Sequence, residues 1–234
     1  MISGNMAEEI PNQVAEAGLD QWYATLSQQD RVRVRRYLNG ISTDTPVAFL
    51  NDLISRAEED RNYRLAVTAG EYLEGMDLDD YGRFVATNGM IEGLFGCDEF
   101  TRAKELCCRN LDLFPSVEDR VRAENGGDIP QKMPCRNRLI DILVGVEANY
   151  DDAVAVLDQY AEMGLIDPVE RDQRKQSLKI HRMQMFFDNV YNYDYKKDRS
   201  RRPSRKSSGG CRWRAPRRGA PPRSWRQRPP DPPP

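Results

Sequence analysis

Residues 84–115, FVATNGMIEGLFGCDEFTRAKELCCRNLDLFP, contain the pattern that decides the fold. Apolar residues recur at helical spacing on both sides of a break at Gly96, and Pro115 removes a backbone donor at the end of the segment. The segment therefore predicts two helices joined by a tight turn. The same periodicity continues over residues 19–195, where strand-like alternation is hard to find, and it predicts an all-α domain.

The hairpin pattern occurs three times along the chain. Three alanines are each preceded, three residues earlier, by an aromatic residue: Tyr63 before Ala66, Phe100 before Ala103 and Tyr150 before Ala153. A small residue lets two helices approach closely, and an aromatic side chain at the start of the second helix fills the space beside the turn. Each hairpin would still have an uncovered apolar face, so we expect the hairpins to stack on one another.

These features resemble the tetratricopeptide repeat (TPR), a helix-turn-helix unit of about 34 residues. The resemblance implies a short right-handed α-solenoid, and it is closest over 84–115. Its three units are expected at about 46–78, 84–115 and 134–166. The chain departs from the family pattern where a tryptophan is expected early in each first helix, since those positions are Leu50, Thr87 and Asn137.

The spacing of the alanines predicts an inserted element. Ala66 and Ala103 lie 37 residues apart, whereas Ala103 and Ala153 lie 50 apart. In the longer interval, Ser116 with Asp119 has the pattern of a capping box, which predicts a short helix after Pro115.

Flanking segments complete the expected organisation. Thr45-Pro46 and Asp167-Pro168 each place an N-cap residue before a proline at the first helical position. Helix stops are expected at Asn39-Gly40, Gly75, Gly96, Pro115, Gly126-Gly127 and Gly164. The segments predicted are a loosely ordered N-terminus over 1–18, a helical repeat domain over 19–195 with capping helices at 19–38 and 168–192, and a disordered Arg/Pro-rich tail over 196–234. The Met and aromatic residues of the last capping helix are expected to pack against the final repeat rather than to line a ligand groove.

The net charge of −2 conceals two oppositely charged parts. Residues 199–234 contain 11 Arg, one Lys and one Asp, a net charge of +11, so the rest of the chain carries −13. This tail also holds 9 of the 15 prolines and no Ile, Leu, Val, Phe, Met or Tyr, so it has little apolar surface to offset the entropy of ordering. Disorder of the tail is the prediction.

Cysteine usage and hydropathy predict a cytoplasmic protein. The five cysteines are an odd number without a C-x-x-C pair, as expected of free thiols in a reducing compartment. No run approaches the roughly 20 apolar residues that cross a bilayer, and the first 19 residues lack a secretion signal. We therefore expect no membrane partner.

Catalytic patterns are missing from the sequence. His181 is the one histidine, so zinc motifs built on histidine pairs are excluded, and no phosphate-binding glycine loop occurs. The pairs Asp79-Asp80 and Asp151-Asp152 fall at predicted helix starts, where capping explains them. Cys107 is expected to be a buried thiol. These observations predict a non-enzymatic protein without metal or cofactor.

Binding is therefore the expected class of function. The TPR resemblance implies that the first helix of each unit lines a concave face where a protein or peptide docks. The residues placed there are Asn51, Ser55, Glu58, Asn88, Glu92, Phe95, Arg138 and Ile142. Their acidic character favours a partner with a basic segment, while Arg138 is the one cation available to clamp a partner's C-terminal carboxylate. The alternative is that these positions are simply a solvated helix surface.

The tail allows three interpretations. Its arginines and tryptophans, among them Arg212, Trp213, Arg214 and Trp225, would suit nucleic-acid binding by phosphate contacts and base stacking. It could instead fold back on the acidic body of the chain. The third interpretation is a solvated extension or the product of a shifted reading frame. The sequence does not define the oligomeric state or the partner.

Overall fold

The computed structural model describes residues 10–201 of the chain, and every regular element in that range is helical. The helices are α1 (Asn12–Glu16), α2 (Asp20–Thr25), α3 (Gln28–Tyr37), α4 (Pro46–Glu59), α5 (Tyr63–Glu74), α6 (Asp80–Gly96), α7 (Phe100–Glu124), α8 (Pro134–Asp141), the π-helical turn η1 (Ile142–Val146), α9 (Tyr150–Glu162) and α10 (Pro168–Arg201). The all-α prediction is confirmed. Predictions about residues 1–9 and 202–234 lie outside the described residues, and with them those for Arg212, Trp213, Arg214 and Trp225.

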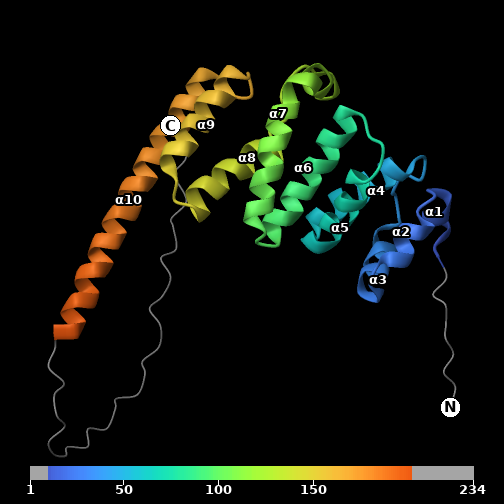
Figure 1. Ribbon diagram of the computed structural model, residues 1–234, viewed down its shortest axis with the longest axis horizontal. Coiled ribbons are helices and arrows are strands. Elements are labelled where there is room, and N and C mark those ends of the chain that lie inside the picture. The colour runs from blue at the N-terminus through green and yellow to red at the C-terminus, as the bar shows by residue number, and fades with distance from the viewer. Residues whose placement is uncertain (1–9, 202–234) are drawn as a thin grey trace, which may run out of the picture. The chain divides into compact units, whose positions relative to one another are not determined.

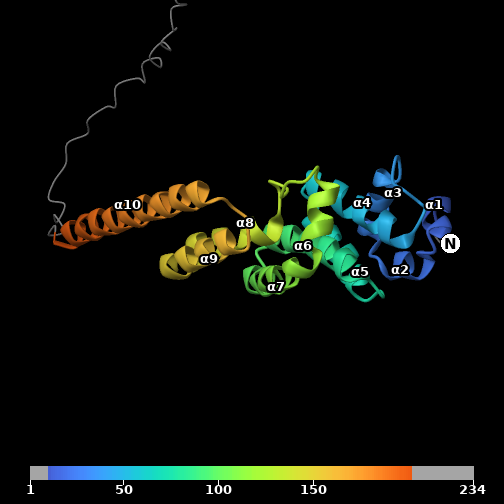
Figure 2. The same ribbon diagram turned by 90° about the horizontal axis from the view of Figure 1, so that it is seen from above.

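The chain divides into two compact units, Met1–Phe187 and Asp188–Pro234, with the boundary inside α10. In the first unit, helices adjacent in sequence pack on one another from α4 to α8 (Figures 1 and 2). Helices two apart also touch, α4 with α6 and α6 with α8. The first helices of the three hairpins are therefore neighbours in space.

The turns inside the three hairpins share a left-handed residue at the same position. A non-glycine residue with left-handed backbone lies two residues before the aromatic that begins the second helix: Arg61 (φ 58°) before Tyr63, Asp98 (φ 61°) before Phe100 and Ala148 (φ 52°) before Tyr150. The first two turns close as in a Schellman motif, with the Asn62 N–H bonded to the Ala57 carbonyl and the Glu99 N–H to the Leu94 carbonyl, five residues back. In the third turn the Asn149 N–H bonds the carbonyl of Leu143 in η1, six residues back. The three aligned alanines are fully buried. The positions used to align the hairpins thus occupy equivalent places.

Two apolar clusters form the core, and α6 contributes to both. The first cluster covers α1 to α5 and includes Trp22 and Leu53, with Ala86 of α6 at its edge. The second covers α6 to α9 and includes Phe84 and Phe114. Because Val67 of α5 also belongs to the second cluster, α5 and α6 together join the two clusters.

Helix starts follow the capping residues seen in the sequence. Thr45 Oγ1 accepts the Ala48 N–H at 3.1 Å with Pro46 as first helical residue, and Asp167 Oδ1 accepts the Glu170 N–H at 2.8 Å before Pro168. Asp79 likewise caps α6 through the Gly82 N–H. These predictions are confirmed. The glycine stops are confirmed as left-handed at Gly40, Gly126, Gly127 and Gly164, whereas Gly75 has φ −77° and the left-handed residue after α6 is Asp98 rather than Gly96.

The predicted stop at Pro115 is wrong. α7 runs through Pro115 to Glu124, and Ser116 Oγ donates to the Leu113 carbonyl at 2.8 Å instead of capping a new helix. Val117 and Val121, which follow the proline, are buried in the second cluster, so packing of this apolar stripe offsets the missing backbone donor. The inserted element is the last part of α7 followed by a loop over 125–133.

Replacing Pro115 with alanine is expected to raise the free energy of unfolding by about 1 to 2 kcal/mol. An interior proline costs a helix about 3 kcal/mol, and its stiffening of the unfolded chain returns up to about 1 kcal/mol. Pro115 is exposed, so the change leaves no cavity. Urea unfolding measures the effect, with Ser116→Ala as a control expected to stay within about 0.5 kcal/mol. A loss of stability in Pro115→Ala would contradict the interpretation.

Part of the N-terminal segment that was expected to be loosely ordered is helical. Asn12–Glu16 form α1, in which Val14 is fully buried, and the C-cap residue Ala17 is 3% exposed against the first cluster. Ile10 and Val14 make a weak pattern alone, but α2 and its neighbours supply a surface that covers them. The predicted capping helix at 19–38 is present as α2 and α3.

The last capping helix is longer than expected and its apolar cluster is not core. α10 continues to Arg201 instead of ending near 192, since the next proline is Pro203. Leu178 packs on the second cluster. The large apolar residues that follow are exposed by 42–64%: Ile180, Met183, Met185, Phe186, Phe187 and Val190. Packing of this group against the final repeat was therefore a wrong prediction.

Candidate binding face

Four of the eight predicted binding residues converge where α4, α6 and α8 meet, and we call this area the first-helix face. Glu58 comes from α4, Glu92 and Phe95 come from α6, and Arg138 comes from α8. Gly89 makes the convergence close, because a Cβ atom there would lie 2.6 Å from Ile54 Cγ2 and 3.7 Å from Glu58 Oε1. Because Gly89 has no side chain, α4 approaches α6 closely, and the backbone of α6 covers the Glu58 carboxyl group.

Arg138 is held by three groups at once. Its Nε and Nη2 donate to the two carboxylate oxygens of Glu92 at 2.8 and 2.5 Å, and its Nη1 donates to Asp141 Oδ2 at 2.8 Å. The guanidinium carbon also lies 4.3 Å from the Phe95 ring centroid. The hydrogen bond to Glu92 raises the pKa of Arg138 further above its usual range. Arg138 is therefore committed within the chain and is a poor clamp for a partner's carboxylate.

Glu58 lacks comparable partners. Its side chain is 11% exposed, and Oε1 is buried with no hydrogen-bond donor. The nearest cation is Lys132, whose Nζ lies 3.8 Å from Oε2 and whose own side chain is 78% exposed. The pKa of Glu58 is raised from 4.5 to about 7: burial is the largest cause, Glu92 also raises it, and Lys132 and Arg138 oppose the shift. At neutral pH this carboxyl group is about half ionised, and its Oε1 is a buried acceptor without a donor.

The other predicted positions have structural roles or are exposed. Asn88 donates to the Phe84 carbonyl at 3.1 Å and accepts the Cys135 N–H at 2.9 Å, which ties α6 to α8. Ser55 is exposed and donates to the Asn51 carbonyl within α4. Ile142 is fully buried, so its placement on a binding surface was wrong: the π-helical turn η1 directs it into the second cluster. Lys132 and Asp141 also contribute to this face, and they were not predicted because they belong to no repeated pattern.

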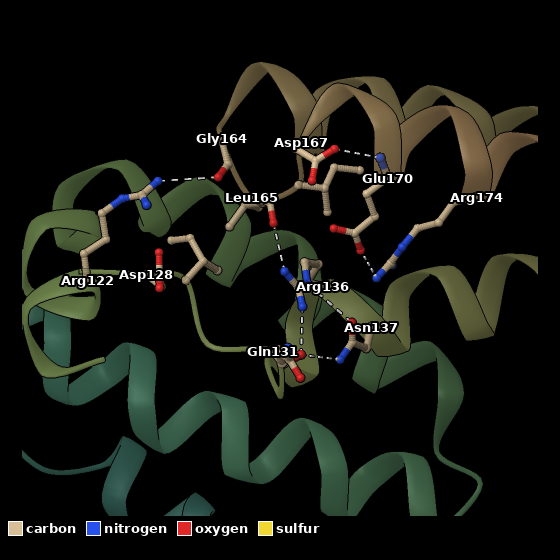
Figure 3. Close-up of a pocket in the computed structure, with 12 residues that line it drawn as sticks. Arg122, Asp128, Gln131, Arg136, Asn137, Gly164, Leu165, Asp167, Glu170 and Arg174 are labelled. Atoms are coloured by element: carbon tan, nitrogen blue, oxygen red, sulfur yellow. Dashed lines mark hydrogen bonds and ion pairs between the residues drawn. The ribbon is translucent and has the colours of Figure 1, made fainter. Parts of the chain in front are cut away.

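A cavity of about 870 Å³ lies between the inserted loop and the α9–α10 connection (Figure 3). Arg136 lines it and is 6% exposed, donating to the carbonyls of Leu165 at 2.8 Å and Gln131 at 2.7 Å. Arg122 pairs with Glu118 and Arg174 with Glu170. The three guanidinium groups already have acceptors, so the cavity has no unpaired arginine to bind an anion. The first-helix face, by contrast, has an unpaired acceptor in Glu58 Oε1 that can bind a donor.

The buried thiols Cys107 and Cys135 are held in the neutral form, and His181 contacts a tyrosine. Cys107 is fully buried, as predicted, and burial raises its pKa; the same effect raises the pKa of Cys135 to about 12. His181 Nδ1 lies 2.8 Å from the Tyr150 hydroxyl oxygen at the α9–α10 contact. Over residues 10–201, no group of three or more His, Cys, Asp or Glu side chains could hold a metal ion.

Comparison with protein-family models, characterised proteins and solved structures finds no match to this chain. Within the described part of the chain, no helix combines the length and apolarity needed to cross a bilayer.

Proposed function

We propose that this chain is a non-enzymatic scaffold whose first-helix face binds a protein or peptide segment. In this proposal the three hairpins form a TPR-like, right-handed α-solenoid. The repeated turn geometry supports this arrangement, because equivalent aromatic and left-handed residues begin α5, α7 and α9. Adjacent first helices leave one face of the stack for a ligand.

The buried, unpaired Oε1 of Glu58 carries the proposal. Leaving a buried acceptor unpaired costs about 1 to 3 kcal/mol, more for a charged group, so a partner that supplies a donor recovers this energy on binding. Glu92 adds negative charge nearby, while Arg138 is neutralised by Glu92 and Asp141. The partner is therefore a segment with a Lys or Arg side chain, which enters beside Lys132 and pairs with Glu58.

Binding to Glu58 is tested with a pair of neighbouring variants. Peptides selected from a random library by the full-length chain are expected to be rich in Lys and Arg. Glu58→Gln is expected to weaken their binding by tenfold or more at pH 8, since truncating one partner of a buried charge pair costs about 2 to 5 kcal/mol. Glu59→Gln, the adjacent exposed carboxylate on α4, is the matched control and should bind as the parent does. Isothermal titration calorimetry supplies the affinities.

Equal affinities in the two variants would contradict the proposal. So would loss of partner capture when residues 199–234 are removed, because the first-helix face lies outside that segment. Nucleic-acid binding through Arg212, Trp213, Arg214 and Trp225 stays the alternative. It predicts RNA or DNA binding that disappears with the tail and weakens steeply with salt.

A further inference from the structure

One face of α10 is apolar and exposed. Ile180, Met183 and Phe187 follow one another at i, i+3 and i+7, and they are 50%, 55% and 50% exposed. Phe186 adjoins this stripe and is 64% exposed. Helical spacing places these residues on one side of α10, and we call them the α10 apolar face.

The opposite side of α10 attaches it to α9. Leu178 packs on the second cluster, His181 lies against Tyr150, and Arg182 donates to Asp151 at 2.9 Å. Lys175 pairs with Asp158 on the same side. Because these contacts fix the orientation of α10, its apolar face points away from α9.

Basic residues border the α10 apolar face. Lys175, Lys179, Arg182 and Phe186 follow at i, i+4, i+7 and i+11, so the three cations lie along the border between the apolar face and the side attached to α9. Within residues 10–201, Lys179 forms no ion pair, whereas Lys175 pairs with the partly exposed Asp158 and Arg182 with the exposed Asp151 of α9. Residues 173–187 contain four Lys or Arg and no acidic residue, and residues 199–234 add +11.

We propose that the α10 apolar face lies on an anionic lipid surface. A helix with an apolar face and a basic edge buries its apolar side at the boundary between headgroups and acyl chains. Stable anchoring of this kind requires two signals, and the chain has both an apolar face and a polybasic segment that follows it. The expected absence of a membrane partner rested on the lack of a spanning segment, and a helix lying on the surface needs none.

Charge and apolar area argue against a second copy of the chain or a nucleic acid as the occupant of this face. A second copy would bring Lys179 against itself, where like charges repel, because only the other three cations of residues 173–187 have a carboxylate partner within the described residues. Nucleic acid would satisfy the cations but would leave two phenylalanines and a methionine uncovered. An anionic bilayer complements both the charge and the apolar area.

Vesicle co-sedimentation tests the proposal with the full-length chain. The chain is expected to sediment with vesicles of phosphatidylcholine plus phosphatidylserine, to sediment weakly with phosphatidylcholine alone, and to be released as salt rises. The triple variant Met183→Gln, Phe186→Gln, Phe187→Gln is expected to lower the lipid partition coefficient by about tenfold or more. The control replaces Val32 and Val146, which are 58% and 48% exposed on other helices, with glutamine and should bind as the parent does.

Three outcomes would overturn the proposal. The parent chain could fail to sediment with anionic vesicles, or the triple variant could bind them as tightly as the parent, which would assign lipid binding to the tail alone. The third is a parent that is dimeric by light scattering while the triple variant is monomeric, which would assign the face to a second copy. Circular dichroism of the triple variant checks that its helix content is kept, as expected for substitutions at exposed positions.

Discussion

Stability is expected to fall as pH rises from about 4.5 to 7, and Glu58→Gln is expected to abolish most of this fall. The folded state binds the Glu58 proton more tightly than the unfolded state, because burial raises the pKa from 4.5 to about 7. Below pH 4.5 both states are protonated and no stability is lost. Between 4.5 and 7 the unfolded state releases its proton first, so unfolding becomes easier; above 7 the effect is complete.

The size of this effect follows from the proton affinities. A tenfold change in proton affinity is worth about 1.4 kcal/mol. Raising the pKa from 4.5 to about 7 therefore means that ionised Glu58 destabilises the folded state by about 3 kcal/mol. Glutamine removes the charge but keeps a buried polar group. We expect Glu58→Gln to be more stable than the parent by about 2 kcal/mol at pH 8 and nearly equal to it at pH 4.

Urea unfolding at several pH values measures both curves. Glu59→Gln is again the control, and its stability should follow that of the parent at every pH. If Glu58→Gln and the parent have parallel pH profiles, Glu58 is ionised without penalty in the folded state. That result would also remove the main support for a binding role, since a satisfied carboxylate gains little from a partner's cation.

The same residue links stability to binding. A basic side chain that pairs with Glu58 favours the ionised form, so binding near pH 7 should release protons. Calorimetry in buffers with different ionisation enthalpies detects this release. Glu58→Gln should bind the basic segment weakly and without proton release, whereas Glu59→Gln should bind it with the same proton release as the parent.

Local sequence signals predicted the local structure where one interaction dominates. Thr45-Pro46 and Asp167-Pro168 begin helices as expected, because capping depends only on adjacent residues. Pro115 shows the limit of this reasoning. Its local signal is a helix stop, yet the burial of Val117 and Val121 across the proline outweighs it, and that burial depends on partners distant in sequence.

The candidate site was predictable only in part. The alignment of the hairpins placed Glu58, Glu92 and Arg138 on one surface, and these three residues do lie close together in the structure. The sequence could not show that Arg138 pairs with Glu92, because that contact spans two hairpins. Ile142 was misplaced because η1 changes the helical register at the end of α8, and a π-helical turn leaves no clear composition signal.

The exposure of the α10 apolar face also could not be predicted from the sequence. Residues 178–187 have the apolar content of a core helix, and periodicity cannot distinguish a face covered by its own chain from one that is left open. Leu178 is partly buried against the second cluster, whereas Ile180 and the large apolar residues after it are exposed, so contact with the rest of the chain ends near Leu178.

Phe114→Ala is expected to give the largest loss of stability, about 3 to 5 kcal/mol. Phe114 is 1% exposed, and its ring centroid lies 6.1 Å from that of Phe84, so it joins α7 to α6 inside the second cluster. Removing the ring leaves a cavity between two long helices that cannot close without moving the chain around Pro115. Leu113→Ala, at a partly buried position beside it, is the control and should cost clearly less.

The loss should be uneven along the chain if the hairpins form a stacked array. Stability in such an array is a sum of units and nearest-neighbour interfaces, so damage at the α6–α7 interface spreads mainly to the elements packed on it. Hydrogen exchange followed by mass spectrometry should show lost protection in α7, α8 and α9 of Phe114→Ala. The α4–α5 hairpin, whose core belongs to the first cluster, should retain most of its protection. A uniform loss across α1 to α9 would identify a single cooperative bundle and would contradict the solenoid on which the binding face depends.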